Sequence, residues 1–145
     1  MILVDANILI YAYDETSASH RAARAWVEDA FGQEDEVGIA LVSILAFLRI
    51  MTNPMLFDTP MSVAEAAEIV TEWVSRPNVG LVQPTQRHFE LVAELARGGK
   101  ARGPLLMDAH LAALAIEHGA TLCTSDRDLW RFPGLRVEDP LTDRP

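Results

Sequence analysis

The chain starts with Met1-Ile2-Leu3-Val4-Asp5 and continues with Ala6-Asn7-Ile8-Leu9-Ile10, so that a short apolar run stops at an acid. Such a run is typical of a buried strand, here over residues 2–5, and the apolar residues after it suit a helix over residues 7–13. A carboxylate at the end of a buried strand needs a cation, hydrogen-bond donors or water. Asp5 therefore predicts either the N-cap of that helix or part of a functional site.

Two later segments place acids at similar boundaries. Asp108-Ala109-His110 lies near the start of an apolar helix, and Ser125-Asp126-Arg127-Asp128 follows the strand-like Thr121-Leu122-Cys123-Thr124. Taken singly, Asp108 also suits the positive end of a helix dipole, and Asp126 and Asp128 are ordinary turn residues. Taken together, Asp5, Asp108 and Asp126 indicate a divalent-cation site, because Mg²⁺ takes oxygen ligands and needs only a few carboxylates.

Length and composition limit the class of protein. The 145 residues suit a single domain spanning 1–145, and half of them are hydrophobic, so we expect a packed core and no disorder. The apolar runs fall short of the roughly 20 residues that span a bilayer, and no basic segment precedes the first of them as in a signal peptide. Cys123 is the only cysteine, which excludes an internal disulfide. These features predict a cytoplasmic protein without membrane contact.

The net charge of −9 bears on the kind of partner. Proteins that bind nucleic acid through their bulk surface are usually basic, so this charge argues against non-specific DNA binding. Eleven of the twelve cations are arginines, which suit bidentate contacts to phosphate. The charge is therefore compatible with a nuclease whose acidic site is neutralised by metal ions.

Strand-like and helix-like segments alternate along the chain. Strands are expected at 2–5, 37–41, 79–82, 120–124 and near 135–137, and helices at 18–31, 43–52, 62–75, 85–97 and 105–118. Ser43 and Ser62 are the candidate caps of two of these helices. The alternation predicts an α/β fold with a mainly parallel central sheet and helices on both faces. Ligands of such sheets bind outside the carboxyl ends of the strands, where Asp5 and Asp126 are expected.

Three motifs occur in order along the chain. They are Val4-Asp5-Ala6-Asn7-Ile8-Leu9, then Asp108-Ala109-His110-Leu111-Ala112-Ala113-Leu114-Ala115 with Gly119-Ala120-Thr121, and finally Thr124-Ser125-Asp126-Arg127-Asp128-Leu129. Together they resemble PIN-domain ribonucleases, and more narrowly the VapC toxins of bacterial type II toxin–antitoxin modules. The stretches Phe47-Leu48-Arg49-Ile50-Met51-Thr52-Asn53-Pro54 and Phe132-Pro133-Gly134-Leu135 resemble one branch of that group. The resemblance covers essentially the whole chain.

The resemblance implies a fold, a reaction and partners. It implies a three-layer α/β/α domain that cleaves RNA endonucleolytically with Mg²⁺ or Mn²⁺, forms a homodimer, and is inhibited by a small antitoxin wrapped around it. By position, Asp5, Asp108 and Asp126 match the metal-binding acids of the family, and Asp128 matches a further acid, so all four are expected to be catalytic. Asn7 and Thr124 or Ser125 are expected to orient the carboxylates and water.

One position departs from the family pattern. The family commonly carries a Glu on its third helix, three residues before an Arg. Here Ala46 stands three residues before Arg49, and no acid occurs from Val37 to Phe57. This gap weakens the case for a two-metal site. It also leaves open a degenerate PIN fold that binds an antitoxin or RNA without cutting.

Two other enzyme classes that use a strand-end Asp are less well supported. A phosphatase of the haloacid-dehalogenase type needs a second Asp where Asn7 stands, and Lys100 is the only lysine available to it. A phosphorylated receiver domain needs a Lys after a late strand, where Thr124-Ser125 stand. Dinucleotide binding lacks the glycine-rich turn that would follow the first strand.

Several side chains outside the acids are candidates for contacts with RNA or with a partner. Arg49, Arg102, Arg127 and Arg131 are candidates for the RNA backbone, although exposed or salt-bridged positions explain them equally well. Trp130 is a candidate for base stacking, but packing in the core or in an interface is the favoured interpretation. His20, His88 and His118 show no metal-like spacing and predict structural roles. His110 lies two residues after Asp108 and points to another helix face, so it is not expected to be a catalytic base. Residues 41–51 contain only Ser43 and Arg49 as polar groups, which predicts either a core helix or a surface for the antitoxin or a second subunit.

Overall fold

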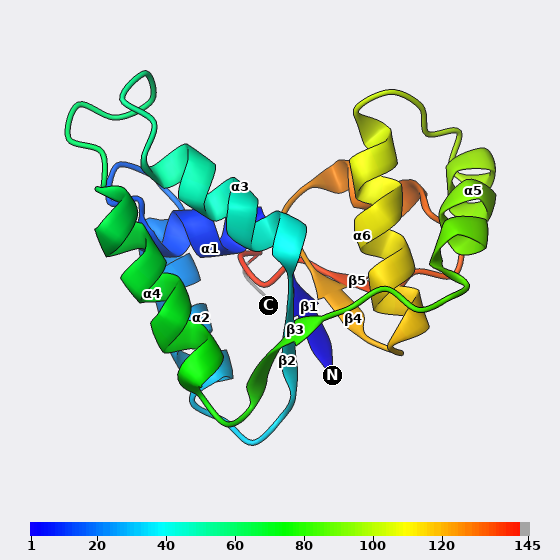
Figure 1. Cartoon of the computed structure of the whole chain (residues 1–145), viewed down its shortest axis with the longest axis horizontal. Helices are drawn as coiled ribbons and strands as arrows, with labels where there is room; N and C mark the ends of the chain where they lie inside the picture. Colours follow the sequence, from blue (N-terminus) through cyan, green and yellow to red (C-terminus); the bar gives the residue numbers. More distant parts are fainter. Residues whose placement is uncertain (143–145) are drawn as a thin grey trace.

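The computed structural model describes residues 1–142, in which a five-stranded sheet lies between two groups of helices (Figure 1). The strands are β1 (Ile2–Val4), β2 (Val37–Ala40), β3 (Val79–Val82), β4 (Thr121–Cys123) and β5 (Val137–Glu138). The helices are α1 (Ala6–Tyr13), α2 (His20–Phe31), α3 (Leu41–Met51), α4 (Val63–Ser75), α5 (His88–Gly98) and α6 (Leu105–Glu117), with a 3₁₀ helix η1 (Arg127–Arg131). Within this described part, no helix is both long and apolar enough to cross a membrane.

The sheet has the order β3-β2-β1-β4-β5, and its four strand pairs are all parallel. Parallel strands need crossover connections, and the helices provide them on both faces of the sheet. This arrangement confirms the predicted three-layer α/β/α fold. It also places β1 at the centre, between β2 and β4.

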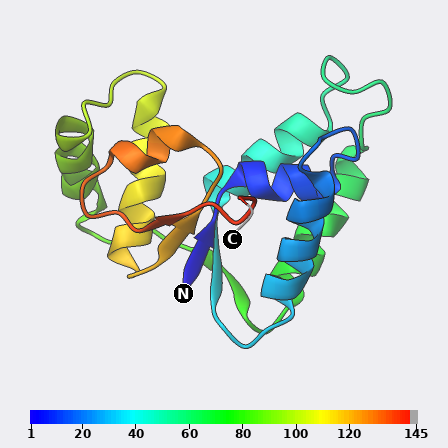
Figure 2. The same ribbon diagram turned by 180° about the vertical axis from the view of Figure 1, so that it is seen from behind.

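Two hydrophobic cores fill the space on the two faces of the sheet. Leu3 and Val4 are neighbours on β1 but belong to different cores, because successive side chains of a strand point to opposite faces. Val4 joins the core of α1 to α4, where the rings of Phe47 and Trp73 pack with centroids 4.7 Å apart. Leu3 joins the core of α5, α6 and η1, which includes buried Leu114. The two helix groups form two lobes in both views (Figures 1 and 2).

The local signals located most elements but missed some boundaries. Ser62 caps α4 as predicted, since its hydroxyl accepts a hydrogen bond from the Glu65 N–H at 3.1 Å. Ser43 does not cap α3, because the chain passes directly from β2 into a helix that begins at Leu41 and leaves Ser43 buried inside it. The helix expected at 85–97 begins at His88, and the last strand lies at Val137–Glu138 rather than near 135–137.

A glycine on β2 leaves room for a side chain of the neighbouring edge strand, β3. Gly38 lies on β2 and pairs with Gly80 of β3. A Cβ atom added to Gly38 would overlap Cγ2 of Val82, whereas one added to Gly80 would meet nothing within 4 Å. The side chain of Val82 is buried, so it has little room to move away.

We expect Gly38→Ala to destabilise the protein by about 1–3 kcal/mol, because overpacking a closed core forces side chains or backbone to shift. The matched variant Gly80→Ala should change the free energy of unfolding by less than about 0.5 kcal/mol. Urea unfolding of both variants measures the difference. Equal effects would show that the contact with Val82 does not limit the packing of this sheet.

Candidate metal site

The centre of the site is the side-by-side pairing of β1 and β4. Val4 pairs with Cys123, so the next residues of the two strands, Asp5 and Thr124, emerge together at the carboxyl end of the sheet. The Asp5 N–H donates to the Cys123 carbonyl oxygen at 3.0 Å, which extends the ladder one step beyond the strands. The sheet therefore fixes the position of the first predicted acid.

Asp5 caps α1 and faces the candidate site at the same time. Its Oδ1 accepts a hydrogen bond from the Ala6 N–H at 2.7 Å, as a helix cap does, and its Oδ2 accepts from the Thr124 hydroxyl at 2.7 Å. Burial raises the pKa of Asp5, the hydrogen bonds from Thr124 and Ala6 lower it, and the charge of Asp126 raises it again. The sequence offered two alternatives for Asp5, a helix cap or a part of a functional site, and the Asp5 side chain can fill both roles at once.

The Thr124 hydroxyl connects three parts of the site. Besides donating to Asp5, it accepts hydrogen bonds from Nδ2 of Asn7 at 3.2 Å and from the Asp126 N–H at 3.0 Å. Thr124 itself is fully buried. Oδ1 of Asn7 is also buried and has no hydrogen-bond partner within residues 1–142. A buried amide oxygen without a donor is unfavourable, and a cation or a water molecule would satisfy it.

Three acids come together next to this network. One carboxylate oxygen from each of Asp108, Asp126 and Asp128 lies within 4.8 Å of the other two. Asp108 comes from the first turn of α6, Asp126 caps η1, and Asp128 lies in the first turn of η1. Asp5 adds its charge to this group, since it raises the pKa of Asp108. The structure thus joins all four predicted acids electrostatically, with Asp108, Asp126 and Asp128 as the compact set.

The acids repel one another. The pKa of Asp108 is raised to about 6, chiefly by burial and then by the charges of Asp126, Asp5 and Asp128, while Arg131 lowers it. A site that combines carboxylates with an unpaired amide oxygen offers oxygen ligands alone, which suits a hard divalent cation. These residues therefore fit the kind of ion that the sequence predicted.

Arg131 is held beside the acids. Its guanidinium donates to the Asp128 carboxylate at 3.4 Å, to the Asp128 carbonyl at 3.2 Å and to the Gly99 carbonyl at 3.3 Å. These contacts tie η1 to the α5–α6 loop and occupy the guanidinium, so Arg131 is less available for RNA than the sequence suggested. Arg49, Arg102 and Arg127 are exposed, as is Trp130.

The histidines include a group that sequence spacing missed. His88 and His110 are hydrogen-bonded to each other, and His88 also contacts Glu117. Burial and the neighbouring His88 lower the pKa of His110, and Glu117 opposes this shift. His88 is 22 positions from His110 and 29 positions from Glu117 along the chain, so no local motif signals their contacts. His88 is therefore not an isolated structural histidine, as the sequence had suggested.

Comparison with known proteins agrees with this geometry. The profile of the PIN domain family matches residues 2–135. Ribonuclease VapC37 of Mycobacterium tuberculosis is 40% identical over 140 residues, covering 97% of both chains. Ribonuclease VapC33 of the same species is 35% identical over 143 residues, covering 99% of this chain and 100% of the relative.

Solved structures show the same fold. VapBC-1 from nontypeable Haemophilus influenzae has a TM-score of 0.68 at 17% identity, covering 98% of this chain and 100% of that one. DNA-bound VapBC from Salmonella typhimurium has a TM-score of 0.65 at 22% identity, covering 97% and 99%. The chain therefore belongs to the PIN-domain family, in the branch of the VapC ribonucleases.

In the metal-free protein, we expect Asp108→Asn to raise the free energy of unfolding near neutral pH. The pKa of Asp108 is about 6 in the folded chain and 3.8 as its ordinary value, so the folded state loses stability as the pH rises through 6. After allowance for solvent screening of a half-buried group, the gain should be about 1–2 kcal/mol.

Thermal unfolding in the presence of a chelator measures this gain. It should diminish as the pH falls from 6 and disappear below 3.8, because the wild-type carboxyl is then neutral in both states. Asp58→Asn, at an exposed loop position, provides the control and should change little. A gain that is independent of pH would place its cause outside the charge of Asp108.

Proposed function

We propose that this chain is the toxin of a type II toxin–antitoxin module and acts as an endoribonuclease that depends on Mg²⁺ or Mn²⁺. The observation that carries the proposal is the group of acids at the carboxyl ends of β1 and β4, in a chain 40% identical to a protein named as a VapC ribonuclease. The substrate is RNA, and the reaction is hydrolysis of a phosphodiester bond.

The acids have separate roles in this proposal. Asp5, Asp108 and Asp126 hold the cation, and Asp128 either completes the set or orients water. When bound, the ion supplies positive charge for the phosphate in the transition state and activates the attacking water. Thr124 and Asn7 keep Asp5 and Asp126 in place through the hydrogen bonds described above. Arg131 holds Asp128 against the α5–α6 loop.

The protein partner is proposed from the neighbouring structures. They include complexes named VapBC and one described as a toxin–antitoxin complex from Klebsiella pneumoniae. By analogy, a cognate antitoxin binds this chain, and the chain forms a homodimer. Leu41 and Leu45, on one side of α3, are more than half exposed and supply apolar surface for either contact.

The test is RNA cleavage by the purified, antitoxin-free chain with Mg²⁺ or Mn²⁺ against chelator. Asp5→Asn and Asp108→Asn should each lower the rate at least about 100-fold, because losing about 3 kcal/mol of charge stabilisation has that effect. Asp58→Asn, an exposed acid away from the site, should retain activity.

Two outcomes would contradict the proposal. No cleavage of total RNA by folded protein would favour the degenerate module that binds an antitoxin or RNA without cutting. Metal-independent cleavage that survives both substitutions would place the active site elsewhere or reveal a contaminating nuclease.

A second prediction concerns the hydroxyl that joins the acids. We expect Thr124→Val to lower the cleavage rate about 10–100-fold, the usual effect of removing a group that orients metal ligands. Thr121→Val makes the same substitution at the start of β4, where residues 1–142 provide no comparable side-chain contact to an acid, and should retain activity. The ratio of rates under saturating metal measures the effect. Full activity of Thr124→Val would show that the backbone alone positions Asp5.

A further inference from the structure

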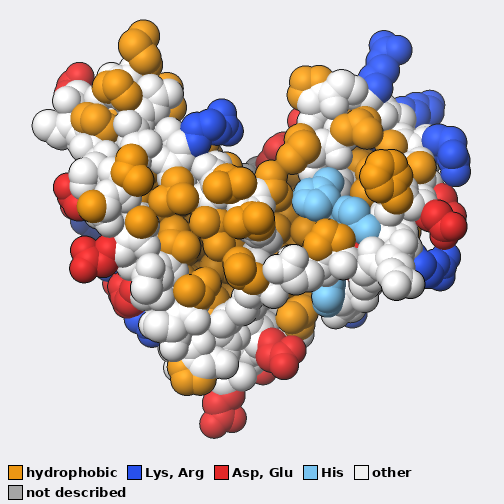
Figure 3. Space-filling view, viewed as in Figure 1, with side chains coloured by type: hydrophobic (Ala, Val, Ile, Leu, Met, Phe, Trp, Pro, Cys, Tyr) orange, Lys and Arg blue, Asp and Glu red, His pale blue; other side chains and the backbone are white. Residues whose placement is uncertain are grey.

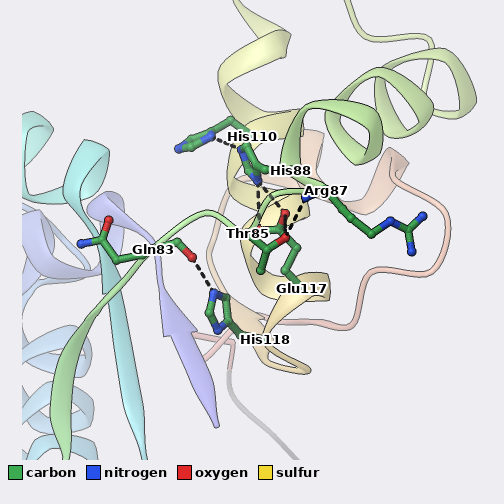
Figure 4. Close-up of polar contacts among 7 residues, drawn as sticks. All are labelled: Gln83, Thr85, Arg87, His88, His110, Glu117 and His118. Atoms are coloured by element: carbon green, nitrogen blue, oxygen red, sulfur yellow. Dashed lines mark hydrogen bonds and ion pairs between the residues drawn. The ribbon is translucent and has the colours of Figure 1, made fainter.

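A second cluster of polar side chains lies between α5 and α6, outside the acids of the candidate metal site (Figure 4). It consists of Thr85, His88, His110 and Glu117, connected end to end by hydrogen bonds. His88 is the first residue of α5, Thr85 lies three residues before it, and His110 and Glu117 lie on α6. The cluster has no part in the proposed cleavage reaction.

Glu117 fixes the orientation of the His88 ring. Both carboxylate oxygens of Glu117 lie 3.0 Å from Nδ1 of His88, and the Thr85 hydroxyl donates to one of them at 2.9 Å. The side chains of Glu117 and His88 are only 4% and 13% exposed. A carboxylate accepts hydrogen bonds and donates none, so Nδ1 of His88 carries the hydrogen.

This orientation determines what the other ring nitrogen does. In neutral His88, Nε2 carries a lone pair, which is directed at Nδ1 of His110 2.7 Å away. The half-buried ring of His110 lies at the outer end of the chain of contacts. Histidine side chains reach the surface on this face of the molecule, bordered by hydrophobic side chains (Figure 3). Glu117 therefore holds the His88 ring in place, whereas the His110 ring remains accessible to solvent.

A histidine that binds a metal usually donates its other N–H to a carboxylate, which fixes the tautomer and strengthens the ligand. His88 with Glu117 has this arrangement, and His110 supplies a second nitrogen next to the first. We propose that His88 and His110 form a second metal site, for a transition-metal ion such as Zn²⁺, Ni²⁺ or Cu²⁺, with Glu117 orienting His88.

The geometry needs only a small adjustment. Two imidazole nitrogens that bind one ion at about 2.0–2.1 Å lie about 2.9–3.4 Å apart, so the two rings must separate by a few tenths of an ångström or slightly more. The hydrogen that His110 shares with His88 moves through solvent to Nε2 of His110, and no net proton is released. Water fills the remaining positions of the ion.

The ligand types distinguish the two sites. Imidazole nitrogen suits Zn²⁺, Ni²⁺ and Cu²⁺, whereas the carboxylates of Asp108, Asp126 and Asp128 suit Mg²⁺ or Mn²⁺. The inference goes beyond the proposed ribonuclease activity and does not depend on it, because its readout is metal binding.

The experiment titrates Ni²⁺, Zn²⁺ and Cu²⁺ into tag-free protein by calorimetry, with Cu²⁺ paramagnetic resonance to detect nitrogen ligands. His110→Gln is the decisive variant, because the new amide can still donate to His88 and preserve the contact between the helices while the imidazole ligand is lost. We expect His110→Gln to weaken metal binding at least about tenfold and to remove the hyperfine coupling of Cu²⁺ to the His110 nitrogen. Glu117→Gln should weaken binding about 10–100-fold.

Two variants serve as controls. His118→Gln removes an exposed histidine of the same lobe, and Asp108→Asn alters the carboxylate site; both should retain the nitrogen signal. Absence of binding to the wild type would overturn the proposal, and so would equal binding by wild type and His110→Gln, which would leave the cluster as a contact between helices. Loss of the signal in Asp108→Asn would assign the ion to the acids and also overturn it.

Discussion

The parallel pairing of β1 with β4 is the constraint on which the candidate site depends. It sets Val4 beside Cys123, and this register brings Asp5 and Thr124, 119 positions apart, within a hydrogen bond. The Thr124 hydroxyl then bonds to the Asp126 N–H, so the acids of both strand ends share one buried contact. A shift of one residue in the register would turn the apolar side chains of β1 to the wrong faces. The packing of the two cores therefore also fixes the positions of the acids.

The residues of the candidate site lower the stability of the folded chain. Burial and mutual repulsion raise the pKa of Asp108 to about 6, which means that its ionised form is disfavoured in the folded protein. Among residues 1–142 the buried amide oxygen of Asn7 has no hydrogen-bond partner, which lowers the stability of the fold further. Groups that are unfavourable alone and become favourable with a cation are typical of functional sites. Arg131 offsets part of the repulsion without entering the compact set of acids.

The sequence predicted the fold, which the structure confirms, and it named the acids that the fold brings together. It did not predict how these acids are arranged. Short strand-like runs that alternate with helical segments indicated the parallel strands, and strands buried on both faces lack the polar–apolar alternation of exposed ones. The cap at Ser62 was visible because it is local, whereas β2 passing directly into α3 left no local signal and made Ser43 look like a cap. The role of Thr124 as a shared partner depends on register, which the sequence does not specify.

The histidine cluster shows the same limit more sharply. His88, His110 and Glu117 lie far apart along the chain, and each is unremarkable alone. Their contacts follow from the packing of α5 against α6, which is decided by the apolar residues between them, such as buried Leu95 and Leu114. A pattern search that looks for closely spaced ligands finds nothing here, although three titratable side chains meet in the fold.

The distribution of charge reconciles the acidic chain with an RNA substrate. Residues 1–82 contain 12 acids and 4 cations, whereas residues 83–145 contain 9 acids and 8 cations, so the excess negative charge lies almost entirely in the first part. That first part forms the lobe of α1 to α4, and Lys and Arg side chains gather on the lobe of α5 and α6 in Figure 3. In the proposed function, RNA approaches from the α5–α6 side, where a cation held by the acids would offset much of their negative charge. In the same proposal, the acidic α1–α4 lobe would repel RNA and suit a basic segment of a protein partner.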